Sequence, residues 1–158
     1  MSKPPAWVQE YIGKTYELGA CGPDSFDCYR LMAVVMGEKY KRPVPLKGDM
    51  VPDPSGGRGA FLRAIAGMLG ERADWQEVDA PQPGDGILLR HGKHEAHCGL
   101  VVAVLPRPAG HPPAGWMLHI HKGINVTCEI WHGPRWGNRV VGFHRYVGAG
   151  RYVGGGDG

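Results

Sequence analysis

Apolar residues recur at helical spacing in the first half of the chain. Four of them fall on one side of a helix, because residues three or four positions apart share a face: Leu31, Met32, Val35 and Met36. Ser25 is a residue type that caps helix starts, and Gly37 is a type that ends helices, so the pattern predicts a helix between them. Two more helices are predicted on the same grounds, over residues 5–12 and 60–69.

The second half of the chain changes to the alternation that is typical of strands. The turn sequence Pro-Gln-Pro-Gly-Asp-Gly at 81–86 leads into an apolar run. Strands are predicted over residues 87–90, 97–105, 116–121, 124–131 and 139–147. Because helices come first and strands follow, we expect an α+β fold with an antiparallel sheet. Residues 1–147 are expected to form one domain, and the glycine-rich residues 148–158 a flexible tail.

The composition argues against several classes of protein. The chain has 158 residues and a formal net charge of +3, and its basic residues are scattered, which argues against nucleic-acid binding. No apolar run approaches the ~18 residues that a membrane-spanning helix needs, so no membrane span is expected. The N-terminus lacks the apolar stretch of a signal peptide, so we expect synthesis in a reducing cytoplasm without export. The 4 cysteines are then expected to remain free thiols.

One cysteine and two histidine-bearing strands form a candidate catalytic set. Cys28 lies at the predicted helix start, where an anion is favoured, and His97 and His119 lie on predicted strands further on. A helix N-terminus lowers the pKa of a thiol by about one unit, so a reactive thiol also needs a cationic neighbour, usually histidine. The alternative is that Cys28 is a small buried apolar residue, as most free cysteines are.

The other histidines leave one choice open. His119 and His121 are two positions apart and share one face of a strand, so either can be the third catalytic residue. Five more lie in loops or beside polar residues and are expected at the surface: His91, His94, His111, His132 and His144. The sequence has neither a CxxC pair nor an HExxH motif, so no metal and no cofactor are predicted.

Three segments, which follow one another between about residues 11 and 147, give the sequence a resemblance to a known family. They are Phe26-Asp27-Cys28, then Pro83-Gly84-Asp85 with His97-Cys98-Gly99-Leu100, then Leu118-His119 before Gly123 and Val126. Together they resemble the NlpC-type cysteine peptidases, which are papain-like endopeptidases of the bacterial cell wall. The resemblance implies an α+β fold in which N-terminal helices, the cysteine helix among them, pack on a small antiparallel sheet.

The resemblance also implies a role for each matching residue. Cys28 would be the nucleophile, His97 the general base and His119 the residue that orients the base. Tyr16 and Asp27 would lie at the substrate, with Tyr16 helping the backbone N–H of Cys28 to bind the oxyanion. The implied substrate is a peptidoglycan stem peptide, cut at a γ-D-glutamyl bond to a diamino acid.

One departure from the secreted members narrows the resemblance. Those members have Ser-Gly after the cysteine, whereas this chain has Tyr29-Arg30. A bulky residue there resembles members encoded by bacteriophages and prophages, which implies an enzyme carried on the virion tail to the host wall, with tail-tip proteins as partners. Two alternatives stay open: a non-catalytic structural module of the tail tip, and a thiol amidase or acyltransferase that acts on another acyl group.

Overall fold

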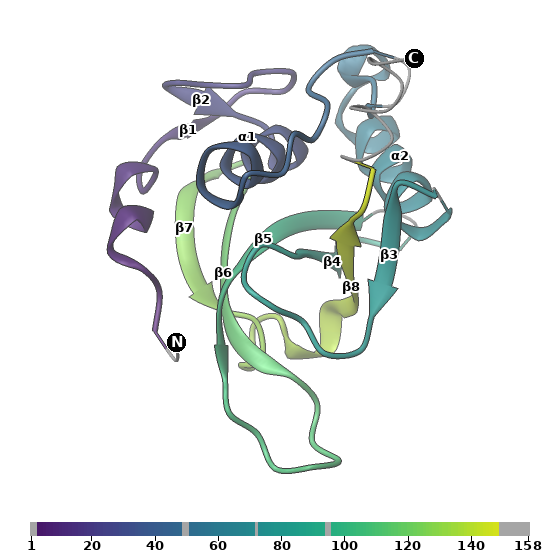
Figure 1. Cartoon of the computed structure of the whole chain (residues 1–158). Helices are drawn as coiled ribbons and strands as arrows, with labels where there is room; N and C mark the ends of the chain where they lie inside the picture. Colours follow the sequence, from purple (N-terminus) through teal and green to yellow (C-terminus); the bar gives the residue numbers. More distant parts are fainter. Residues whose placement is uncertain (1–2, 49–50, 72, 94–95, 149–158) are drawn as a thin grey trace, which may run out of the picture.

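The computed structural model describes residues 3–48, 51–71, 73–93 and 96–148, and within them it has two α-helices and a six-stranded sheet (Figure 1). The helices are α1 (Cys28–Tyr40) and α2 (Arg58–Glu71), with short 3-10 helices at Ala6–Glu10, Pro54–Gly56 and Gly137–Arg139. The strands are β3 (Trp75–Val78), β4 (Gly86–Arg90), β5 (Ala96–Leu105), β6 (Ala114–His121), β7 (Ile124–Ile130) and β8 (Val140–Tyr146). Their order is β3-β8-β4-β5-β6-β7, and all neighbours are antiparallel.

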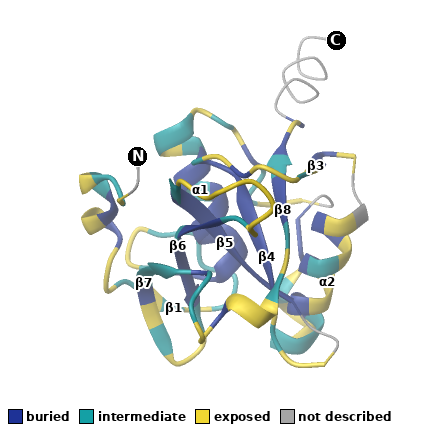
Figure 2. Cartoon of the chain, turned by 90° about the horizontal axis from the view of Figure 1, so that it is seen from below, coloured by how far each residue is buried: buried dark blue, intermediate teal, exposed yellow. Residues whose placement is uncertain are grey.

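Both helices pack on this sheet. The α1 helix lies across β5 and β6, while α2 contacts β5 and β3 (Figure 1). The strands β4, β5 and β6 are largely buried, whereas β3, β7 and β8 are less covered, and α2 keeps one exposed side toward solvent (Figure 2). The arrangement is an α+β fold with helices on an antiparallel sheet, which confirms the fold class predicted from the sequence.

The start of α1 is fixed by Asp27. Its carboxylate accepts a hydrogen bond from the backbone N–H of Arg30 at 2.8 Å, which is the N-cap contact. The predicted cap, Ser25, lies instead in β2 (Ser25–Phe26). The helix also continues past Gly37 and ends at Tyr40, followed by the C-cap residue Lys41, whose φ of 59° is left-handed. Both predicted limits are wrong, because the buried Asp27–Arg30 pair sets the start and a helix tolerates one glycine at modest cost.

The chain before α1 is attached to the β7 edge of the sheet. The short strand β1 (Thr15–Tyr16) pairs in parallel with β2. Two backbone hydrogen bonds join Val126 of β7 to the preceding segment, one to Gly13 and one to Lys14. This attachment holds Tyr16 close to the start of α1.

The Pro-Gly-Asp turn before β4 joins three parts of the chain. The Asp85 carboxylate is buried and accepts two hydrogen bonds from the Arg145 guanidinium on β8, each 2.8 Å long. Arg42, just after α1, lies 3.4 Å from the same carboxylate and donates to the carbonyl of Gly84. The turn requires a glycine at that position, because its φ is 99°. Asp85 thus ties the end of α1 to β4 and β8.

The strands β5 and β6 form a hairpin whose loop lies at the end opposite to residue 97. The register pairs Leu100 with Leu118 and Leu105 with Ala114. Residues 106–113 connect the two strands. The hairpin therefore aligns the start of β5 with the end of β6.

The structure has every predicted strand, with limits that shift by one or two residues. β3 is absent from the predictions, because it is short and pairs with β8 from a distant part of the sequence. The predicted helix at 5–12 is a 3-10 helix, and the predicted helix at 60–69 is part of α2. Among the described residues, no helix has the length and apolar character to cross a membrane. Most of the predicted tail, residues 149–158, lies outside the described residues.

Candidate active site

Cys28 is the first residue of α1 and is only 1% exposed. Its thiol is hydrogen-bonded to the thiol of Cys98 on β5, and burial together with this contact raises the pKa of Cys98 well above its usual value. The backbone N–H of Cys28 belongs to the first turn of the helix, where N–H groups have no partner within the helix. Cys28 therefore combines a thiol with a donor suited to an anion, although its sulfur lies against another thiol.

Strand β5 separates two kinds of side chain, because successive residues of a strand point to opposite faces. Cys98 belongs to the apolar core beneath α1. His97 points to the other face, where its ring stacks on Trp136 at a centroid distance of 5.7 Å. We call the two sides the thiol face, with Cys28 and Cys98, and the histidine face, with His97, His119 and His121.

A chain of hydrogen bonds crosses three strands on the histidine face. Nε2 of His97 on β5 lies 2.8 Å from Nδ1 of His119 on β6. Nε2 of His119 lies 2.6 Å from Oε2 of Glu129 on β7. Both histidines are fully buried, and the Glu129 side chain is 24% exposed. Glu129 was not among the residues predicted from the sequence.

The second ring nitrogen of His97 is unused. Its Nδ1 atom is buried and has no hydrogen-bond partner among the residues that the structure describes, Cys28 included. The structure thus brings His97 and His119 together but does not join Cys28 to His97 by a hydrogen bond. Catalytic hydrogen bonds are often long in sites without substrate and tighten when substrate binds.

His121 lies in the same cluster of rings. Its ring centroid is 5.5 Å from that of His97 and 5.9 Å from that of His119. Its Nε2 atom is buried and has no hydrogen-bond partner within the described part of the chain. Of the two candidates for the third catalytic residue, His119 is therefore the one that is hydrogen-bonded to His97.

The histidines expected at the surface differ in burial. His144 is 4% exposed on β8, so that expectation is wrong, because the packing of the sheet covers its side chain. His91 and His132 are half-buried, and the His91 ring lies 6.2 Å from that of His97. His111 is exposed as expected, and His94 lies outside the described residues. Despite these rings, the described residues contain no group of three or more His, Cys, Asp or Glu side chains placed to hold a metal ion.

Tyr16 and Arg58 link the surroundings of Cys28 to the histidine cluster. Tyr16 lies close enough to Cys28 for the thiol to affect its pKa, which burial raises to about 12. The phenol is therefore protonated at neutral pH and can donate a hydrogen bond. Arg58, the first residue of α2, interacts with the Tyr16 side chain and lies 2.6 Å from Nε2 of His91 through its guanidinium.

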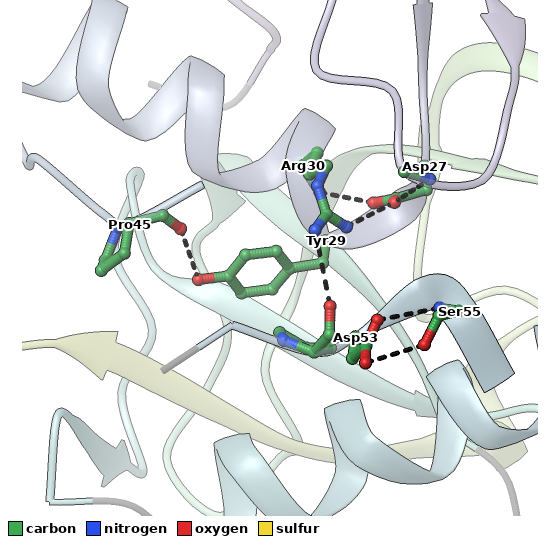
Figure 3. Close-up of polar contacts among 8 residues, drawn as sticks. Asp27, Tyr29, Arg30, Pro45, Asp53 and Ser55 are labelled. Carbon is green, nitrogen blue, oxygen red and sulfur yellow. Dashed lines mark hydrogen bonds and ion pairs between the residues drawn. The ribbon is translucent and has the colours of Figure 1, made fainter. Parts of the chain in front are cut away.

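The Asp27 carboxylate is fully occupied by neighbours. It accepts the backbone N–H of Arg30 and that of Gly19, each at 2.8 Å, and pairs with the Arg30 guanidinium at 2.7 Å (Figure 3). These contacts fix the start of α1 and hence the place of Cys28. A direct contact of Asp27 with substrate stays a prediction.

The two bulky residues after Cys28 hold the loop that follows α1. The Tyr29 hydroxyl donates to the Pro45 carbonyl at 2.9 Å, and the Arg30 guanidinium donates to the Pro52 carbonyl at 3.5 Å (Figure 3). Small residues at these positions could not make either contact. Tyr29-Arg30 therefore has a structural role in this chain that Ser-Gly could not supply.

The electrostatics of the histidine face favour a neutral base. Burial lowers the pKa of His97 well below its usual value, and the nearby rings of His119, His121 and His91 add to the effect. A lowered pKa disfavours the cationic histidine that was predicted beside the thiol from the sequence. The hydrogen bond from His119 lowers the pKa of Glu129, which keeps that carboxylate ionised. His97 is thus a neutral imidazole that can accept a proton.

The sequence pattern of the NlpC/P60 family matches residues 13–145, most of the chain. This chain belongs to the NlpC/P60 family. The matched range contains the cysteine and both histidines of the candidate site. It also contains the Pro-Gly-Asp turn, so the family resemblance of the sequence is confirmed.

Curated sequences and solved structures of similar proteins are consistent with membership of this family. "Probable endopeptidase p60" of Listeria seeligeri is 28% identical over 140 residues, which cover 89% of this chain and 21% of that protein, and its namesake in Listeria welshimeri gives the same figures. The chain thus spans about a fifth of the length of these relatives. The solved structure of NlpC2 from Trichomonas vaginalis superposes with a TM-score of 0.52 at 20% identity, over 88% of this chain and 44% of that one. At this identity the likeness shows the fold.

Proposed function

We propose that the chain is a cysteine peptidase that hydrolyses peptidoglycan stem peptides, at the bond between a γ-D-glutamyl residue and a diamino acid. The observation that carries the proposal is the His97–His119 pair, which leaves one buried imidazole nitrogen available to take a proton. This nitrogen belongs to His97 on β5, and β5 packs under the helix that starts at Cys28. Membership of the NlpC/P60 family, and relatives named as probable endopeptidases, support the reaction class.

In the proposed reaction the Cys28 sulfur exchanges its contact with Cys98 for one with His97. The sulfur attacks the carbonyl carbon of the scissile bond while Nδ1 of His97 takes the thiol proton. The backbone N–H of Cys28 and the hydroxyl of Tyr16 hold the oxyanion. His97 then protonates the leaving amine, the C–N bond breaks and a thioester remains. Water loses a proton to His97 and attacks the thioester, and the departing sulfur takes that proton back.

A cleavage assay with purified muropeptides as substrate tests this reaction. We expect the wild type to cleave them, with mass spectrometry identifying the bond, and Cys28→Ala to lose at least ~10³-fold in rate, because the nucleophile is removed. The matched control is Cys21→Ala, which removes a half-buried free cysteine and should cleave normally. No cleavage by the wild type, or unchanged cleavage by Cys28→Ala, rejects the peptidase. A trapped acyl-enzyme whose mass does not fit a stem peptide points to an amidase or acyltransferase.

We further propose that the enzyme travels on a phage or prophage tail, with tail-tip proteins as partners, and acts at the host cell wall. The support is Tyr29-Arg30 after the cysteine, the feature in which this chain resembles phage-encoded members. Mass spectrometry of tails purified after prophage induction should detect the chain. If the chain is absent from tails but the purified protein cleaves normally, the tail location is contradicted and the peptidase function is not.

A non-catalytic module of the tail tip is the second candidate. It is favoured by the complete burial of Cys28 and by the contact of its thiol with Cys98 instead of His97. Electron microscopy of tails that carry Cys28→Ser separates the two functions. Normal tails with lost infectivity support the enzyme, whereas failed tail assembly supports the structural module.

A further inference from the structure

The three-residue chain His97–His119–Glu129 constrains where the ring protons lie. A carboxylate can only accept hydrogen bonds, so Nε2 of His119, which lies 2.6 Å from Oε2 of Glu129, must carry a proton. In a neutral ring the other nitrogen then has none, and Nδ1 of His119 is an acceptor. With both rings neutral, the proton between Nε2 of His97 and Nδ1 of His119, which lie 2.8 Å apart, therefore belongs to His97. That leaves Nδ1 of His97 with a lone pair.

The surroundings of the chain hold this arrangement in place. Trp136 stacks on the His97 ring at 5.7 Å and meets the His119 ring edge-on at 5.2 Å, which restricts both rings. Arg135 lies 4.0 Å from the other carboxylate oxygen of Glu129, so a positive charge stabilises the ionised acid. Burial keeps His97 neutral, as its lowered pKa shows. The ring contacts with Trp136 therefore hold both imidazoles in place, and the ionised Glu129 keeps the proton on Nε2 of His119.

We propose that Glu129 is a positioning residue that sets the tautomer of His119 and, through it, the tautomer of His97. Its effect is to present Nδ1 of His97 without a proton, as the atom that accepts the proton from Cys28. The inference rests on the proposed function for its use in catalysis, but not for the tautomers themselves. Glu129 touches neither Cys28 nor any reacting atom in this scheme, and it acts only through the two rings.

Nuclear magnetic resonance of protein labelled with 15N-histidine measures the tautomers directly. Long-range proton–nitrogen correlations show which ring nitrogen carries the proton, and His97→Gln and His119→Gln assign the signals. We expect both His97 and His119 of the wild type to carry the proton on Nε2. A wild-type His97 that carries its proton on Nδ1 overturns the inference without any variant.

The decisive variant is Glu129→Gln, because an amide can donate as well as accept and no longer dictates the proton on His119. We expect mixed tautomers at both rings and a loss of about tenfold or more in muropeptide cleavage, with folding retained. The matched control is Glu10→Gln, an exposed carboxylate paired with Lys39, which should change neither readout. Tautomers unchanged in Glu129→Gln contradict the inference. If the wild type shows the expected tautomers but does not cleave muropeptides, the role of Glu129 is supported and the peptidase function is rejected.

Discussion

The thiol face and the histidine face are carried by successive residues of one strand, yet they differ in almost every physical respect. Cys98 is packed among apolar side chains beneath α1, and its polar contact is another thiol. His97 is equally buried but begins a chain of hydrogen bonds that reaches a carboxylate near solvent. Strand alternation thus lets one short segment serve the core and the candidate chemistry at once. In the proposed reaction, Cys28 at the start of α1 must leave its contact on the thiol face and reach His97.

The largest expected effect comes from replacing Asp27, which fixes the start of α1 and hence the place of Cys28. Asp27→Ala removes the cap of α1 and leaves the Arg30 guanidinium buried without its ion pair. Removing one partner of a buried pair costs about 3–5 kcal/mol of unfolding free energy, which chemical denaturation measures. The control is Asp53→Ala, which removes an exposed cap of a short 3-10 helix and should lower the free energy of unfolding much less than Asp27→Ala does. Equal losses in the two variants contradict the anchoring role of Asp27.

A second experiment contrasts the two faces through the reactivity of Cys28. Alkylation at pH 7, followed by peptide mass mapping to separate the cysteines, should be about 10- to 100-fold slower at Cys28 in His97→Ala, because the proton acceptor is lost. In Cys98→Ala the rate should stay the same or rise, since the competing thiol contact is removed. Slowing by the same factor in both variants would show that burial, and not the base, controls the thiol.

The smallest expected effect is on the stability of the histidine face in acid. His121 has a folded-state pKa of about 4, below the usual 6.5, mainly because of burial, with His119, His91 and Arg135 nearby. The unfolded chain therefore takes up protons first, and stability present above about pH 6.5 is lost as the pH falls toward 4. His121→Gln should reduce this loss by about 1 kcal/mol or less between pH 6.5 and 5.5, because the ring is partly exposed.

Urea denaturation at several pH values measures that loss. The control is His111→Gln, an exposed histidine in the loop between β5 and β6, which should leave the pH dependence of unfolding as in the wild type. A wild type whose stability is constant between pH 7 and 5 contradicts the direction given for the buried histidines.

The sequence predicted those parts of the site that depend on local pattern. The apolar spacing around Val35 indicated α1, and the alternation after residue 96 indicated the strands of both histidines. Glu129 could not be found in this way, because it is one polar residue in an alternating strand. Only the register of β6 and β7, which places Glu129 opposite Met117, brings its carboxylate diagonally to His119.

The same limit explains the errors at the ends of α1 and among the histidines. Ser25 and Asp27 are both good capping residues, and the choice is made by the buried Arg30, whose position depends on the packed fold. His144 stands beside Arg145 in the sequence but is covered once β8 lies between β3 and β4. Burial of a polar residue is a property of the assembled sheet, and short sequence windows do not contain it.

The hairpin of β5 and β6 has a practical consequence. Its connecting residues 106–113 join the strands where Leu105 meets Ala114, at the end remote from His97 and His119. Lengthening this connection within its exposed residues 106–112 leaves the spacing of the two imidazoles unchanged, since the ladder of strand pairing intervenes, and it keeps the Pro113 carbonyl that accepts from the Trp131 indole. A fluorescent reporter or an affinity tag inserted there would mark the molecule at the end remote from the candidate site.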